Sequence, residues 1–156
     1  MKSETPFSVC VIGAGLAGSE CAYQLAKRGV SVALIEQRPK KTTAAHHSSL
    51  PAELVCSNSL KSTQLESASG LLKDEMAKLD SLVIRAAYQT RIPAGSALAV
   101  DREAFSEFVF SEIKGFSNVN YVNDVVVDFH RVDDRVEVIC ESGQSISCRR
   151  CVIATG

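Results

Sequence analysis

Three glycines near the start of the chain have the spacing of a phosphate-binding loop. The run Gly13-Ala14-Gly15-Leu16-Ala17-Gly18 lies between an apolar, β-branched stretch and a stretch with helical periodicity. In such a loop the first glycine permits a tight turn, the second leaves room for a pyrophosphate, and the third lets the helix pack close to the strand. Amide groups at the start of the helix, with their partial positive charge, bind phosphates. The motif therefore predicts a dinucleotide site.

An acidic residue follows the next apolar run, which ends at residue 35. Glu36 would accept hydrogen bonds from ribose hydroxyls and repel a 2′-phosphate, which argues against NADP at this site. We also expect Arg38 to contact the cofactor. Arg38, Lys40 and Lys41 are also typical of an RNA-backbone contact or of a solvated loop.

These residues need a strand, a helix and a second strand to position them. Residues 7–12 and 30–35 read as buried parallel strands, and residues 16–28 as a helix that ends before Gly29. Helices are also expected over residues 71–83, from an apolar stripe, and from the N-cap Asp101 to Gly115. The remaining strands are expected at 119–122, 125–129, 136–140, 145–148 and 151–154. The fold class is α/β: a Rossmann-like domain with a parallel sheet and a small β-meander.

Residues 39–69 are rich in Thr, Ser, Ala and His and have no clear period. We expect a long functional loop here, with a short helix around Leu54. His46 and His47 lie in it, where they could touch a bound cofactor or phosphate or be solvated; further metal ligands are lacking.

Composition bounds the class of protein. The chain has 156 residues, is 46% hydrophobic and 22% charged, and has a net charge of −1, which is typical of one soluble globular domain and gives no bulk attraction to nucleic acid. No apolar run approaches the roughly 20 residues of a membrane span, and residues 1–6 lack the pattern of a signal peptide, so we expect a cytoplasmic protein without a membrane partner. Six cysteines then indicate reduced thiols, and Cys148–Cys151 lacks the second ligand pair of a metal site.

The last residues favour FAD over NAD. The run Cys151–Gly156 resembles the strand and Ala-Thr-Gly turn that close the FAD domain of flavoproteins with two dinucleotide-binding domains, and the meander before it also fits that group. Ala154, Thr155 and Gly156 are therefore expected cofactor contacts.

Several further motifs, in register, resemble the folate- and FAD-dependent tRNA (uracil-5-)-methyltransferases. They are Glu36–Pro39, Lys41–His47, Ala52–Ser62, Gly70–Met76 and Pro93–Arg102. The resemblance implies an enzyme that takes a methylene group from methylenetetrahydrofolate, reduces it with electrons from NAD(P)H through FAD, and methylates C5 of the T-loop uridine of tRNA. It also implies that the Val126 backbone borders the adenine.

The resemblance carries an expectation about length. Members of that family continue well past an Ala-Thr-Gly turn, so we expect residues 1–156 to be the N-terminal part of an FAD-binding domain, without the rest of that domain or the inserted domain. The isolated chain is then expected to be inactive as a methyltransferase.

The chemistry implied by the resemblance needs a thiol. Uracil C5 becomes nucleophilic when a thiolate adds to C6, and Cys56 is the candidate within this chain. Cys56 as nucleophile, as acid or base beside the flavin, and as a small buried apolar residue all stay open. Two other hypotheses also stay open: an FAD-dependent oxidoreductase of a small molecule with no RNA partner, and a non-enzymatic fragment that binds FAD weakly or not at all.

Overall fold

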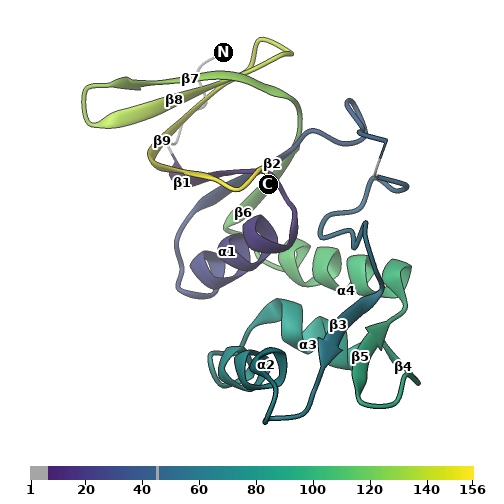
Figure 1. Ribbon diagram of the computed structural model, residues 1–156. Helices are drawn as coiled ribbons and strands as arrows, with labels where there is room; N and C mark the ends of the chain where they lie inside the picture. The colour runs from purple at the N-terminus through teal and green to yellow at the C-terminus, as the bar shows by residue number, and fades with distance from the viewer. Residues whose placement is uncertain (1–6, 45) are drawn as a thin grey trace.

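The computed structural model describes residues 7–44 and 46–156. Residues 1–6, on which the expectation of no signal peptide depends, and Ala45, within the Lys41–His47 motif, lie outside the described residues. The described chain forms a six-stranded sheet, ordered β6-β2-β1-β9-β8-β7, and a three-stranded sheet, ordered β3-β5-β4 (Figure 1). Helices α1 (Leu16–Lys27) and α4 (Arg102–Lys114) lie between the larger sheet and the part that contains the smaller sheet.

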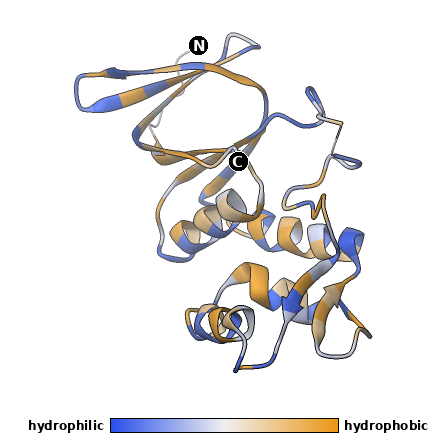
Figure 2. Ribbon diagram, viewed as in Figure 1, coloured by the Kyte–Doolittle hydropathy of each residue, from blue (hydrophilic) through white to orange (hydrophobic). Residues whose placement is uncertain are grey.

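Four strands of the larger sheet run parallel. They are β1 (Phe7–Ile12), β2 (Val32–Glu36), β6 (Val119–Asn123) and the end of β9 (Ser145–Ile153). Val11 packs toward the helices, whereas Cys10 and Ile12 pack in a second apolar cluster with the meander. Because both faces of β1 are covered, its sequence is a continuous apolar run, as expected for a parallel strand. Hydrophobic residues recur along these strands and on the helices (Figure 2).

The prediction of a βαβ unit is confirmed, including the glycine that follows its helix. Helix α1 (Leu16–Lys27) joins β1 to β2 and ends before Gly29, whose φ of +77° is a conformation that favours glycine. The N-cap expected at Asp101 is also present: its side chain accepts a hydrogen bond from the amide of Ala104 at the start of α4 (Arg102–Lys114).

The meander is confirmed with two corrections. The strand expected at 119–122 is β6, which pairs in parallel with β2 at the other edge of the sheet and is not part of the meander. Strands β7 (Val126–Val132) and β8 (Arg135–Cys140) are antiparallel, and β8 pairs with the first half of β9. The two strands expected at 145–148 and 151–154 are one strand, β9, which pairs with β8 through Cys148 and continues along β1 to Ile153. The polar pair Arg149-Arg150 interrupts the apolar pattern without interrupting the backbone pairing.

The middle of the chain differs most from expectation. The single helix expected at 71–83 is two helices, α2 (Ala68–Lys78) and α3 (Leu82–Gln89). They separate at Asp80, where φ is +58°, and Ser81 then caps α3 by accepting from the amide of Ile84. The apolar stripe continues across this break, so periodicity alone does not reveal it.

Three short strands were not expected, and one expected helix is absent. Strands β3 (Ser59–Ser62), β4 (Arg91–Ile92) and β5 (Ala97–Val100) form the smaller sheet. The segment around Leu54, where a short helix was expected, has no helix in the described structure. The irregular segment, residues 39–44 and 46–58, ends where β3 begins, and residues 68 and 69 already belong to α2. Among the described residues no helix has the length and apolar character needed to cross a membrane.

Candidate functional site

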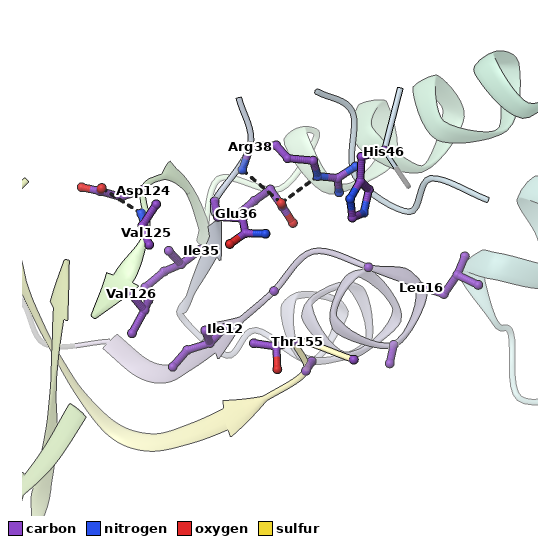
Figure 3. Close-up of a pocket in the computed structure, with 16 residues that line it drawn as sticks. Ile12, Leu16, Ile35, Glu36, Arg38, His46, Asp124, Val125, Val126 and Thr155 are labelled. Atoms are coloured by element: carbon purple, nitrogen blue, oxygen red, sulfur yellow. Dashed lines mark hydrogen bonds and ion pairs between the residues drawn. The ribbon is translucent and has the colours of Figure 1, made fainter. Parts of the chain in front are cut away.

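A pocket of about 330 Å³ lies where the carboxyl ends of β1 and β2 meet the start of α1 and the Ala-Thr-Gly turn (Figure 3). The strand that follows β1 in the chain, β2, lies on one side of β1, and β9 lies on the other. Such a switch point is where open α/β sheets bind ligands. Ten residues expected to contact a cofactor line the pocket: Gly13, Gly15, Leu16, Ala17, Glu36, Arg38, Val126, Ala154, Thr155 and Gly156.

Other expected site residues lie elsewhere. Ala14 and Gly18 are buried and do not line the pocket. Cys56 is exposed on the irregular segment and lies outside the pocket. The lining also includes His46, one of the two histidines for which a cofactor contact or a solvated position stayed open, and five residues that were not expected as contacts: Ile12, Ile35, Gln37, Asp124 and Val125. Asp124 and Val125 directly follow β6, whose carboxyl end reaches the same edge of the sheet as that of β2. Knowing that β6 lies beside β2 would have predicted both residues as part of the site.

The three glycines of the loop have different surroundings. Gly13 has a φ of +98°, and a Cβ there would lie 2.6 Å from the carbonyl oxygen of Ala154. A Cβ on Gly18 would lie 1.8 Å from the carbonyl oxygen of Gly13, so the helix packs on the turn through bare backbone. A Cβ on Gly15 would meet nothing within 4 Å. Gly13 and Gly18 are therefore required by the fold, whereas Gly15 faces open space in the pocket.

Helix α1 directs its first turn at this open space. Gly15 is its N-cap residue, and Leu16 and Ala17 line the pocket. The first amides of an α-helix have no partner within the helix and carry partial positive charge. No acidic side chain lies in this first turn. The arrangement suits an anionic group such as a phosphate.

The opposite wall is a carboxylate held in place. Glu36 Oε2 accepts from the amide of Ala14 over 2.9 Å, and Oε1 accepts from the amide and Nε of Arg38 over 3.1 and 2.8 Å (Figure 3). Burial raises the pKa of Glu36, but these hydrogen bonds and the Arg38 charge outweigh it, so the pKa lies below its usual value. The carboxylate is thus ionised and, with about four lone-pair sites, can accept a hydrogen bond from one further group, such as a hydroxyl.

A second ion pair borders the pocket. Lys40 Nζ lies 2.9 Å from Asp124 Oδ1, and the amide of Val125 donates to the same oxygen over 2.8 Å. Ser142, Lys40 and that amide lower the pKa of Asp124 to about 2. The amide of Asp124 in turn donates to the carbonyl of Glu36, which fixes the end of β6 against the end of β2.

Comparison with known proteins identifies the family. Residues 8–156 match the family model described as "Glucose inhibited division protein A". The chain belongs to this family. The matched range includes the glycine loop, Glu36 and the Ala-Thr-Gly turn.

Relatives are similar over most of this chain but extend far beyond it. The methylenetetrahydrofolate–tRNA-(uracil-5-)-methyltransferase TrmFO of Lactobacillus acidophilus is 57% identical over 122 residues, which are 78% of this chain and 28% of that protein. The protein of the same name from Staphylococcus carnosus is 56% identical over 118 residues, which are 76% of this chain and 27% of that protein. The chain therefore spans less than a third of the length of these curated relatives.

Solved structures support the fold. Aquifex aeolicus GidA superposes with a TM-score of 0.78 at 21% identity, covering 97% of this chain and 25% of that one. The GidA-related protein from Thermus thermophilus has a TM-score of 0.60 at 20% identity, covering 97% of this chain and 54% of that one. At these identities the likeness shows a shared Rossmann-type α/β fold, which confirms the expected fold class.

Proposed function

We propose that this chain binds FAD, with the ADP half in the pocket at the start of α1. The observation that carries the proposal is the open space in front of Gly15, between the first-turn amides of α1 and the ionised carboxylate of Glu36. The amides would hold the pyrophosphate, and the free lone pair of Glu36 would accept a ribose hydroxyl. When bound, FAD would supply redox chemistry, with NAD(P)H as the source of electrons.

We further propose that the chain is the nucleotide-binding portion of a methylenetetrahydrofolate- and FAD-dependent tRNA (uracil-5-)-methyltransferase. The 54–57% identity to proteins of that name supports this assignment over a small-molecule oxidoreductase. The folate, the nicotinamide co-substrate and tRNA are part of the proposal, since this chain spans 28% of the Lactobacillus acidophilus protein. Residues 7–156 would then contribute the nucleotide site, and other segments the remaining contacts.

Cys56 is proposed as the thiol that takes part in methyl transfer. It is exposed and lies outside the nucleotide pocket, so its side chain is free to meet a second substrate while the nucleotide site is filled. Cys10 and Cys148, in contrast, are buried in the sheet. A thiolate adding to uracil C6 would make C5 nucleophilic toward a one-carbon unit.

The nucleotide proposal is tested by FAD binding to the purified chain. We expect flavin fluorescence to be quenched and the unfolding temperature to rise with FAD. Gly15→Val would fill the space in front of the helix amides and abolish binding without unfolding the chain. Gly115→Ala, at the end of α4 with φ −65°, is the matched control and should bind as the wild type does.

The reaction is tested with the full gene product. Labelled methylenetetrahydrofolate should label C5 of a tRNA uridine in an FAD-dependent reaction, and Cys56→Ala should abolish labelling but leave FAD bound. Oxidation of NAD(P)H with a small acceptor, and no labelling of tRNA, would favour the oxidoreductase instead.

A further inference from the structure

Three charged side chains form a buried row beside the pocket. Glu36 ends β2, Arg38 follows it, and Glu53 lies in the irregular segment before β3; their side chains are 6%, 3% and 9% exposed. Arg38 Nε lies 2.8 Å from Glu36 Oε1, and Nη1 lies 3.1 Å from Glu53 Oε2. A buried guanidinium between two carboxylates offsets their repulsion, and removing it would leave buried charges uncompensated.

At one end of the row, Arg38 fixes how Glu36 faces the pocket. Its amide and its Nε both donate to Oε1, which leaves Oε2, already bonded to the amide of Ala14, with one free lone pair. Without the guanidinium, Oε1 loses a donor and the carboxylate can rotate about its terminal torsion, which is soft in Glu. The orientation that suits a ribose hydroxyl therefore depends on Arg38.

At the other end, Arg38 reaches the irregular segment through Glu53. Glu53 Oε1 accepts from the amide of His47 over 2.8 Å, and Oε2 accepts a longer bond, 3.4 Å, from the amide of Ser48. His46, the preceding residue, lines the nucleotide pocket. The row thus joins the Glu36 carboxylate beside the pocket to the backbone at residues 47 and 48.

We propose that Arg38 is a positioning residue that couples nucleotide binding at Glu36 to the order of residues 47 and 48. The inference rests on the proposed function in that the ligand is a nucleotide whose ribose contacts Glu36. A bound ribose fixes the Glu36 carboxylate, which holds Arg38 and hence Glu53 in place. By thermodynamic reciprocity, ordering residues 47 and 48 strengthens nucleotide binding by the same factor.

Direct contact between Arg38 and a phosphate is the competing role. It is disfavoured because two guanidinium nitrogens already donate to carboxylates and the row carries a net charge of −1. The two roles differ at Glu53: a phosphate contact does not need this residue, whereas coupling does.

The test therefore uses Glu53→Gln, which keeps the size of the side chain and removes its charge. ADP is the probe, with its affinity measured by calorimetry and amide exchange at residues 47 and 48 by mass spectrometry. In the wild type we expect ADP to slow this exchange. In Glu53→Gln we expect ADP affinity to fall about fivefold and ADP to have no effect on exchange. Arg38→Lys, which keeps a charge but has no planar fork, should lose about tenfold in affinity.

Each result discriminates among the roles. The control is Glu137→Gln, which should match the wild type; Glu137 lies on the meander, and its carboxylate accepts a hydrogen bond from Ser145. Circular dichroism establishes that each variant is folded. A wild type that binds neither ADP nor FAD would remove the proposed function and the positioning role with it. If the wild type binds ADP and Glu53→Gln binds it equally well, the positioning role alone is overturned. A loss of affinity confined to Arg38→Lys would overturn it too and would indicate direct contact.

Discussion

Gly15 and Gly18 separate the needs of the ligand from the needs of the fold. An alanine at position 18 would place its Cβ 1.8 Å from the carbonyl oxygen of Gly13 and 3.3 Å from the Cβ of Ala154. An alanine at position 15 would meet no atom within 4 Å, and the backbone there, at φ −68° and ψ −170°, is allowed for any residue. We expect the first substitution to lower stability and the second to lower affinity for the nucleotide.

The magnitudes follow from these contacts. Overpacking costs about 1–3 kcal/mol, and a rigid backbone oxygen places Gly18→Ala at the upper end. Replacing a helical glycine returns about 1 kcal/mol, so the net loss is about 2 kcal/mol, or roughly 4–8 °C in unfolding temperature. For Gly15→Ala, a poorer N-cap and a less flexible unfolded chain oppose each other, so the change is within about 1 kcal/mol.

Differential scanning fluorimetry with and without FAD measures both effects. Gly18→Ala should unfold earlier without ligand. Gly15→Ala should unfold near the wild-type temperature without ligand but lose about tenfold in FAD affinity, equivalent to about 1.4 kcal/mol. The reasoning is refuted if Gly15→Ala binds FAD as the wild type does, or if Gly18→Ala is as stable as the wild type.

Three further outcomes are expected. Cys56→Ala should keep FAD affinity within twofold, and iodoacetamide should label Cys56 before the buried thiols of Cys10 and Cys148, as peptide mapping would show; FAD binding that depends on Cys56 would contradict its exposed position. Asp101→Ala should destabilise the chain by about 1 kcal/mol in urea unfolding, because the α4 cap is lost; no change would mean that solvent replaces the cap. Since the folded chain lowers the pKa of Asp124 to about 2, its stabilisation is complete above the unfolded pKa of about 3.9 and is lost as pH falls between these values. Asp124→Asn should therefore flatten the acid limb of a stability–pH curve, and an unchanged limb would contradict the pairing with Lys40.

Local signals in the sequence were sufficient for the nucleotide-binding unit. Periodicity and turn chemistry predict the strand before Gly13, the helix that ends before Gly29 and the acid at Glu36, because each depends on neighbours within a few residues. The break at Asp80 was missed because it depends on a left-handed backbone conformation adopted by a non-glycine residue. The stripe of apolar residues on either side gives no sign of it.

Long-range pairing accounts for the rest of what was missed. Strand β3 is a polar run, Ser59–Ser62, that becomes a strand because β5 lies beside it. Arg38 was expected to contact the cofactor, and it does line the pocket, but its partnership with Glu53 joins side chains that only the fold brings together. Asp124 reaches the pocket because β6 is placed beside β2, an order of strands that sequence patterns do not specify.

The central claim is that the pocket recognises the ADP half of FAD. Competition against bound FAD tests it most directly, with ADP and FMN as the two competitors and released flavin fluorescence as the signal. We predict that ADP displaces FAD completely, because the helix amides and Glu36 bind the pyrophosphate and ribose that ADP shares with it, and that FMN does not. Displacement by FMN but not by ADP would contradict the account.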